Sequence, residues 1–286
     1  MAPFVTRFAP SPTGPLHLGH AFSAMTAHDR AKAAGGRFLL RIEDTDRARA
    51  RPEYESAIYH DLAWLGLTWE QPVLRQSEHL ADYDAALTRL IGLGVAYPCQ
   101  CSRSDILAAL SAPQEGVTHL PPDGLVYPGT CRHRTVADQR PGDAVRLNMA
   151  KALALVGDLT ALGFHDSGPD VSGFHPLLQG HLISQIGDIV LARRDISTAS
   201  YHLAVVVDDA RQGITEVTRG MDLFEATQVH VLLQHLLALP TPAYHHHRLI
   251  RDQNGKRLAK RDDARALSKY RVEGATPQDI RAMVGL

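Results

Sequence analysis

The hydrophobic positions of the first hundred residues predict alternating strands and helices. Residues 4–8 alternate apolar and polar side chains like a short strand, and residues 37–42 are typical of a buried parallel strand. An alanine-rich stretch predicts a helix over residues 21–34, which stops at two glycines. Helical spacing of apolar residues predicts further helices starting at Pro52 and over residues 81–93. This order is that of half a doubly wound α/β fold.

The pattern changes over residues 95–180, where periodicity is weak. This part contains all three cysteines and many prolines and glycines, so we interpret it as an inserted subdomain. Within it, residues 144–149 predict a strand and residues 166–174 a glycine-rich loop. We expect the sheet to resume afterwards, with strands at residues 189–192, 201–209 and 214–219, a helix over residues 223–239 and a last short helix near residues 276–284.

These elements divide the chain into four parts. They are the first half of a Rossmann-type sheet (1–94), the insertion (95–180), the second half (181–240) and a loop with a short helical region (241–286). A chain of 286 residues can bury a core of that size. The net charge of −1 indicates no global attraction to nucleic acid, so a basic surface would have to be local.

Nothing in the sequence predicts secretion or a membrane span. The first seven residues lack the apolar core of a signal peptide. The most apolar run, residues 229–239, is interrupted by polar side chains and is too short for a bilayer. Three clustered cysteines do not suggest a disulfide framework. We therefore expect a cytoplasmic protein.

Candidate chemistry is concentrated in residues 7–20, between the first strand and the first helix. Three prolines and a glycine predict a tight loop there. A loop that leads into a helix N-terminus binds anions, because backbone N–H groups and the helix dipole point to one spot. His17 and His20 add donors for a phosphate, and Gly19 lets a flat base lie against the backbone. The alternative is a proline-rich connector with two surface histidines.

Cys99, Cys101 and Cys131 form a metal-like pattern. Three thiolates and one more donor satisfy tetrahedral zinc, and His133 is a natural fourth ligand by its spacing. A loop-rich insertion has little core and gains stability from a bound metal. Three reduced, partly buried thiols are the alternative. The histidines at 245–247 fit the end of a strand better than a metal site, because adjacent strand residues point apart.

Acidic and basic side chains follow several predicted strands. Glu43 lies just past the second strand, where an open α/β sheet binds ligands, and its carboxylate could hold a cation or an ammonium group. Asp44 and Asp46 are ordinary helix N-cap residues. A substrate carboxylate requires a buried arginine with a planar fork, for which Arg7 and Arg219 are candidates. A surface ion pair is the commoner role of an arginine.

Four motifs resemble those of a known family. Residues 10–20, Pro-x-Pro-x-Gly-x-x-His-x-Gly-His, resemble the HIGH signature of class I aminoacyl-tRNA synthetases in the glutamyl and glutaminyl branch. Residues 41–46 and 217–220 resemble two further landmarks of that branch. Residues 257–261, Arg-Leu-Ala-Lys-Arg, resemble the KMSKS motif, with Ala259 where the family has serine, and seven basic residues gather between 248 and 265.

The resemblance, which covers nearly the whole chain, implies the class I Rossmann-type fold and roles for individual residues. His17, His20 and Lys260 would stabilise charge on the phosphates of ATP, assisted by Mg²⁺, and Glu43 would pair with the amine of L-glutamate. The implied ATP site consists of Pro10, Gly14, His17, Gly19, His20 and Lys260. The implied glutamate site consists of Arg7, Ala9, Ser11, Glu43, Tyr201 and Arg219.

The cysteine region is similar to that of glutamyl-queuosine tRNA(Asp) synthetases, which show C-x-C followed by Y-x-x-x-C. This similarity implies a structural zinc ion held by Cys99, Cys101, Cys131 and Tyr127, although spacing alone favours His133. The chain ends about twenty residues beyond the KMSKS-like region, so we expect a short helical C-terminal region and no anticodon-binding domain.

The implied reaction is ATP-dependent activation of L-glutamate and its transfer to the queuosine base of tRNA(Asp). The enzyme would be a monomer without DNA or membrane partners. Two alternatives stay open. One is an ordinary glutamyl-tRNA synthetase that charges a tRNA 3′ end, and the other is a non-catalytic tRNA-binding paralogue.

Overall fold

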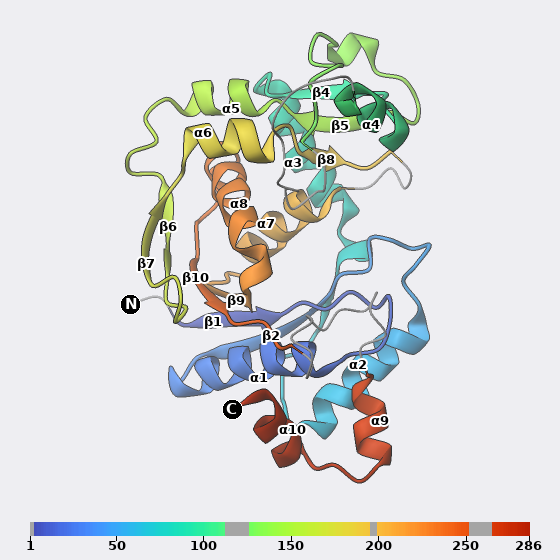
Figure 1. Cartoon of the computed structure of the whole chain (residues 1–286), viewed down its shortest axis with the longest axis vertical. Helices are drawn as coiled ribbons and strands as arrows, with labels where there is room; N and C mark the ends of the chain where they lie inside the picture. The colour runs from blue at the N-terminus through green and yellow to red at the C-terminus, as the bar shows by residue number, and fades with distance from the viewer. Residues whose placement is uncertain (1–2, 112–125, 195–198, 252–264) are drawn as a thin grey trace.

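In the part of the chain that the structure describes, three sheets and the helices around them make up the fold (Figure 1). The computed structural model describes residues 3–111, 126–194, 199–251 and 265–286. In Figure 1, α1 and the C-terminal helices lie at one end of the long axis, and a small sheet lies at the other end. α7 and α8 lie between these two ends.

The first sheet is parallel and comes from the N-terminal part of the chain. Its strands, in spatial order, are β1 (Val5–Phe8), β2 (Arg37–Ile42) and β3 (Leu74–Arg75). The helices that accompany it are α1 (Leu18–Ala33), α2 (Pro52–Trp64) and α3 (Leu80–Gly92). Gly36 starts the return into β2, where a Cβ would lie 2.3 Å from the carbonyl oxygen of Phe4, so only glycine fits.

The C-terminal helices complete the core beneath this first sheet. They are α9 (Leu267–Val272) and α10 (Pro277–Val284). Leu267 and Ile280 are fully buried and pack in one cluster with Met25, Leu40 and Leu62. Burying such side chains stabilises the fold by roughly 1.5–3 kcal/mol each, so the end of the chain is fixed to the half that begins it.

The second sheet has the order β7-β6-β10-β9 and adjoins the first. Its strands are β6 (Gly163–Asp166), β7 (Gly173–Pro176), β9 (Glu216–Gly220) and β10 (Ala243–His247), and its helices are α7 (Tyr201–Arg211) and α8 (Phe224–Leu236). β10 runs parallel to both β9 and β6. The Thr215 N–H donates to the Val5 carbonyl over 2.9 Å, which joins the two sheets next to β1.

The third sheet is antiparallel and carries the cysteine region. Its strands are β4 (Ala96–Cys99), β5 (Ala144–Leu147) and β8 (Val190–Ala192). Helices α4 (Arg103–Ser111), α5 (Met149–Val156) and α6 (Gln179–His181) accompany it. Short 3-10 or π segments are η1 (Gln76–Glu78), η2 (Val136–Asp138), η3 (Leu182–Ile186) and η4 (Met221–Leu223).

Two strand predictions were wrong. Residues 201–209 are not a strand but the helix α7, whose side chains are buried on nearly every face. An apolar run without clear periodicity cannot be told from a buried helix by sequence alone. Residues 189–192 do not resume the parallel sheet, because β8 pairs with β5. Within residues 95–180, β6 pairs with β10 of the second sheet instead of the small sheet.

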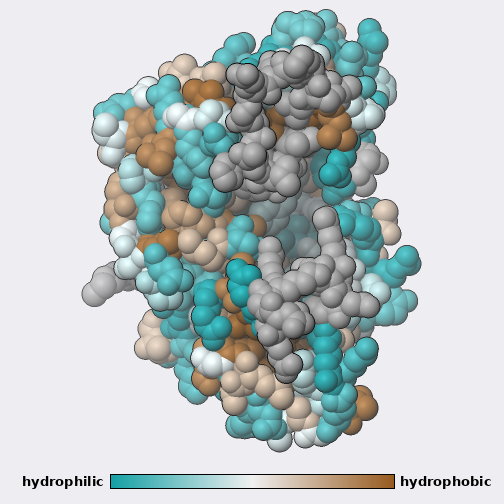
Figure 2. Space-filling view, in the orientation of Figure 1, coloured by the Kyte–Doolittle hydropathy of each residue, from teal (hydrophilic) through white to brown (hydrophobic). Residues whose placement is uncertain are grey.

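The surface in Figure 2 is mostly hydrophilic, with hydrophobic side chains in small separate patches. This distribution is usual for a protein whose large apolar residues are in its core. Among the described helices, none combines the length and the apolar character that a bilayer crossing requires.

A buried ion cluster connects α7 to the first sheet. The Arg41 guanidinium is fully buried and donates to Asp209 over 2.6 Å, while its Nε lies 3.7 Å from Asp208. Arg7 donates to both carboxylate oxygens of Asp209, over 2.8 and 3.1 Å. Tyr83 donates to Asp208 over 2.9 Å. Each charge has an opposite partner, which is what buried ions require.

We expect Arg41→Ala to lower the free energy of unfolding by about 3–5 kcal/mol, because it leaves two buried carboxylates short of a partner. Urea unfolding followed by circular dichroism measures this loss. Arg37→Ala on the same strand is the matched control, because Arg37 is half exposed and pairs with Glu70 at the surface. Its loss should be at most about 1 kcal/mol. Equal losses in the two variants would contradict this account of the cluster.

Candidate active site

The turn between β1 and α1 is held by a histidine pair. The Gly19 N–H donates to His17 Nδ1 over 3.1 Å, and the His17 N–H donates to His20 Nδ1 over 3.2 Å. The two imidazoles therefore form a capping box at the start of α1, with ring centroids 3.8 Å apart. Because each Nδ1 accepts a hydrogen bond, the ring hydrogen is on Nε2 of both histidines.

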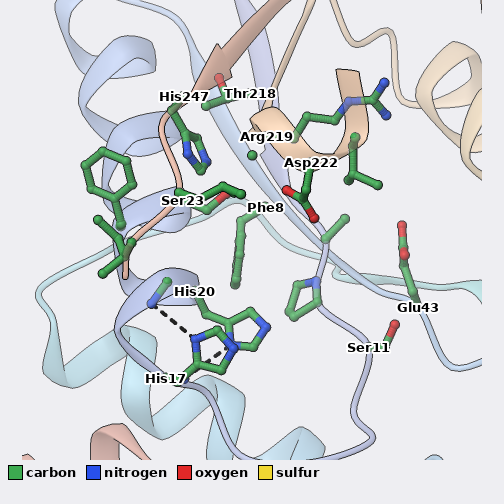
Figure 3. Close-up of a pocket in the computed structure, with 18 of the residues that line it drawn as sticks. Phe8, Ser11, His17, His20, Ser23, Glu43, Thr218, Arg219, Asp222 and His247 are labelled. Atoms are coloured by element: carbon green, nitrogen blue, oxygen red, sulfur yellow. Dashed lines mark hydrogen bonds between the residues drawn. The ribbon is translucent and has the colours of Figure 1, made fainter. Parts of the chain in front are cut away.

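This helix start forms one wall of a cavity of about 540 Å³. Figure 3 shows His17 and His20 together at one side, Arg219 and Asp222 at another, and Glu43 with Ser11 at a third. The predicted site residues that line the cavity are Arg7, Ala9, Pro10, Ser11, His17, Gly19, His20, Glu43, Tyr201 and Arg219. An anion-binding helix start thus faces the same space as arginines and a carboxylate.

Glu43 lies at the end of β2 beside the buried ion cluster. Arg41 donates to its Oε1 over 3.2 Å. Burial raises the pKa of Glu43, against the opposing attraction of Arg41 and Arg7. Burial alone would also raise the pKa of Asp209, but the ion pairs with Arg7 and Arg41 lower it to about 2. Asp209 therefore stays ionised at neutral pH, while Glu43 shares the Arg41 guanidinium with Asp208 and Asp209.

Arg219, at the end of β9, is held by uncharged acceptors. Its Nε donates to His246 over 3.1 Å, and its terminal nitrogens contact His230 over 3.1 Å and Thr227 over 2.6 Å. The side chain is only 6% exposed and lines the cavity. Its guanidinium lines the cavity with His246, His230 and Thr227 as its hydrogen-bond partners, and such a planar fork suits a substrate carboxylate.

Two described segments beside the cavity flank residues 252–264. Leu249 and Ile250 line the cavity on one side of that range. On the other side, Ala266 pairs with His17, and the Leu267 N–H donates to the Leu16 carbonyl over 2.8 Å. Lys260 and the KMSKS-like residues lie outside the described residues, so their predicted role stays a prediction.

The cysteine region brings together three sulfur atoms and one phenol. The Sγ atoms of Cys99, Cys101 and Cys131 lie within 4.8 Å of one another. The Tyr127 hydroxyl oxygen is 3.4 Å from Cys99 Sγ and from Cys101 Sγ, and it accepts the Cys131 N–H over 2.9 Å. His133 is exposed and lines a separate hollow. These three cysteines could hold a metal ion.

A family model describes this chain well. The model for the catalytic domain of class I tRNA synthetases (E and Q) matches residues 3–125 and 177–286. The chain belongs to this family. It is 61% identical over 284 residues to a glutamyl-Q tRNA(Asp) synthetase of Rhodobacter capsulatus, covering 99% of this chain and 100% of the relative. A protein of the same name from Symbiobacterium thermophilum is 41% identical, with 96% and 83% covered.

Solved synthetases have the same fold. A glutamate tRNA ligase from Elizabethkingia meningosepticum, in complex with its amino acid, is 27% identical with a TM-score of 0.74. The match covers 99% of this chain but 60% of that ligase, so the synthetase described here spans less than two thirds of its length. Methionyl-tRNA synthetase of Mycobacterium tuberculosis, at 11% identity and a TM-score of 0.63, shares the fold.

Some expectations for this synthetase differ from its structure. Asp44 accepts hydrogen bonds from Ser77, and Asp46 pairs with Arg49, so neither caps α2, which begins after Arg51. Gly14 is buried in the loop and is not among the residues lining the cavity. Its predicted contact with ATP stays a prediction.

Several residues of the cavity were not predicted as site residues, although some of them lie within the motifs described above. They are Phe8, Thr13, Phe22, Ser23, Thr218, Gly220, Asp222, Leu223 and residues 247–250. One of them could have been found, because Ser23 follows His20 by one helical turn at the start of the predicted helix. The rest depend on how β9 and β10 meet α1, which no local pattern reports.

We expect Glu43→Gln to raise the KM for an amino-acid substrate by about tenfold or more, because the ammonium group of the substrate loses a charged hydrogen-bond acceptor. In the unsubstituted protein this KM should fall as the pH rises through the raised pKa of Glu43, which lies above the ordinary 4.5. The glutamine variant should lack this dependence. Amino-acid-dependent pyrophosphate exchange at several pH values measures both effects. Glu70→Gln is the control, because Glu70 pairs with Arg37 at the surface. If Glu43→Gln and the unsubstituted protein had the same KM, the role of Glu43 would be rejected.

Proposed function

We propose that this synthetase activates L-glutamate with ATP and transfers the glutamyl group to the queuosine base of tRNA(Asp). The observation that carries the proposal is the single cavity in which Arg219, Glu43 and the His17–His20 pair face one another. These groups complement a carboxylate, an ammonium group and a phosphate. An amino acid beside a nucleotide presents all three of these groups. The names of the similar relatives supply the tRNA substrate.

In the proposed first step, the glutamate α-carboxylate attacks the α-phosphorus of ATP. A bond between the carboxylate oxygen and the α-phosphorus forms, the bond to the β-phosphate breaks, and pyrophosphate leaves, so that glutamyl-adenylate remains. The Nε2–H groups of His17 and His20 would donate to the phosphates, and the positive end of α1 would add to this stabilisation. Mg²⁺ bound with ATP supplies further charge neutralisation. Lys260 is proposed to act on the same phosphates. Positioning and electrostatics account for the rate, so no protein nucleophile is required.

Recognition of glutamate is proposed to depend on both ends of the amino acid. Glu43 would hold the ammonium group, and Arg7 and Arg219 would face the two carboxylates. Arg7 shares its fork with Asp209, whereas the partners of Arg219 are neutral. Arg219 therefore provides the larger net attraction for an anion. Ser11 and Tyr201 line the cavity between these groups and would contribute hydroxyls.

In the second step, a hydroxyl of the queuosine cyclopentene ring would attack the glutamyl-adenylate and release AMP. The proposed compartment is the cytoplasm, and the proposed active form is a monomer. The similarity to glutamate tRNA ligases favours one alternative, the charging of a tRNA 3′ end.

We expect tRNA(Asp) that carries queuosine to accept labelled glutamate from this synthetase, and tRNA(Asp) that lacks it to accept none. The reason is that only the first molecule presents the cyclopentene hydroxyl. Acid-precipitable radiolabel measures the transfer, with tRNA(Glu) as a control for ordinary charging. Equal labelling of both tRNA(Asp) samples would reject the choice of acceptor. Absence of glutamate-dependent pyrophosphate exchange by folded protein would reject the enzyme itself.

We also propose that Cys99, Cys101, Cys131 and Tyr127 hold one structural zinc ion. The spacing of the three sulfurs suits tetrahedral coordination. Arg146 donates to Cys99 Sγ over 3.4 Å and lies 4.0 Å from the Tyr127 ring centroid. This cation lies beside two of the proposed ligands. Burial raises the pKa of the Tyr127 hydroxyl, so binding of the metal would have to displace that proton.

We expect protein purified without added zinc to contain about one zinc ion per chain, in line with one four-ligand site. Tyr127→Phe should lower the zinc content and the thermal midpoint, because it removes one ligand. His133→Asn should change neither, because this exposed side chain lies away from the sulfur atoms. Elemental analysis and thermal unfolding measure the two quantities. The reverse result would assign His133 as the fourth ligand.

A further inference from the structure

The β6–β7 hairpin is fixed against β10, whose last residue, His247, lines the active-site cavity. Residues 126–176, which include the hairpin, lie outside the part of the chain that the family model matches. β6 nevertheless pairs with β10 in parallel, and the Ser167 N–H donates to the Tyr244 carbonyl over 2.9 Å. Gly168 lies so close that a Cβ there would be 2.2 Å from the carbonyl oxygen of His246. The contact requires glycine, so the hairpin is held at a defined position.

Asp166 at the end of β6 binds His246 through both carboxylate oxygens. Oδ2 contacts His246 Nδ1 in a short hydrogen bond, and Oδ1 accepts the His246 N–H over 3.2 Å. Oδ1 also accepts the Gly168 N–H over 2.7 Å. Asp166 and His246 are 5% and 1% exposed, so water cannot replace these bonds.

The other nitrogen of His246 faces Arg219. His246 Nε2 accepts from Arg219 Nε over 3.1 Å, which requires the ring hydrogen to be on Nδ1. A carboxylate at Nδ1 selects this tautomer, as it does for histidines held by a carboxylate in catalytic and metal sites. Asp166 therefore determines which nitrogen of His246 is available as an acceptor for Arg219.

The remaining contacts of Arg219 are consistent with this tautomer of His246. Thr227 accepts from the guanidinium over 2.6 Å, and His230 accepts over 3.1 Å while its own Nε2 contacts His202 Nδ1 over 3.1 Å. The register of the second sheet places His246 directly opposite Arg219. With the other tautomer, the Nε2–H of His246 would face the Nε–H of Arg219. Two donors cannot form a hydrogen bond, so the guanidinium group would have to rotate.

We propose that Asp166 is a positioning residue for the recognition of the substrate carboxylate, acting through His246 on the fork of Arg219. The inference rests on the proposed function, in which Arg219 binds a carboxylate of glutamate. It adds that a hairpin outside the family-matched region determines the orientation of this arginine. Asp166 itself is not among the residues that line the cavity.

Asp166→Asn tests the proposal, because asparagine keeps the shape but can donate to His246 Nδ1 and so select the wrong tautomer. We expect the KM for glutamate in pyrophosphate exchange, with tRNA(Asp) present, to rise by about tenfold or more. The KM for ATP should stay within about twofold, because the histidine pair at α1 is unaffected. Asp170→Asn is the matched control on the same hairpin, since Asp170 is exposed.

A second variant covers the case in which the asparagine variant does not fold. Gly168→Ala removes no polar group but forces the hairpin away from the His246 carbonyl, so we expect the same selective rise in the KM for glutamate. Thermal unfolding of every variant reports on folding. Unchanged KM values, or a parallel rise in both, in a folded variant would overturn the role of Asp166. A lack of glutamate-dependent exchange in the unsubstituted protein would instead overturn the proposed function.

Discussion

The ion pairs between α7 and the first two strands are the interaction on which the active site depends. Asp209 binds Arg7 and Arg41 at once, and Asp208 receives hydrogen bonds from Gln76 and Tyr83. The cluster lies between the two halves of the chain and leaves almost no surface to solvent. A buried charge loses its hydration, and only a closely placed opposite charge offsets the free-energy cost of that loss. The positions of these side chains are therefore tightly constrained. Glu43 and Arg7 line the cavity and are held in place by their contacts with this ion cluster.

A second fixed point is the start of α1. Its first turn is capped by imidazoles instead of the usual hydroxyl or carboxylate, and both rings carry their hydrogen on Nε2 at the positive end of the helix. The chain near Ala266 pairs with His17, so the C-terminal helices are connected to this same turn. A movement of these helices would therefore shift His17 at the proposed phosphate site.

The two arginines of the proposed glutamate site differ in their surroundings. Arg7 is compensated by a carboxylate whose pKa is about 2, so its charge is largely used within the protein. Arg219 is surrounded by neutral acceptors, and burial together with its own charge holds the pKa of His230 well below the usual value. Keeping these histidines uncharged preserves the attraction of Arg219 for an anion. The two arginines of the proposed site thus differ in their partners: one pairs with a carboxylate, and the other is held by neutral hydrogen-bond partners.

The sequence by itself determined the local elements and the motifs. The strand, loop and helix around residues 4–34 and the cysteine spacing depend on near neighbours, and proline, glycine and alanine patterns report them directly. The family was accessible for the same reason, because its signatures are short and continuous.

Tertiary structure decided what these elements contact. Consecutive valines led to the prediction of a strand at residues 201–209, yet these residues form the helix α7. The helix is covered on nearly all sides, and it places Asp209 in contact with arginines on β1 and β2. The pairing of β6 with β10, and with it the contact of Asp166 with His246, joins residues eighty positions apart. Such contacts are fixed by packing and by the pairing of buried charge, which act between distant segments and leave no local pattern in the sequence.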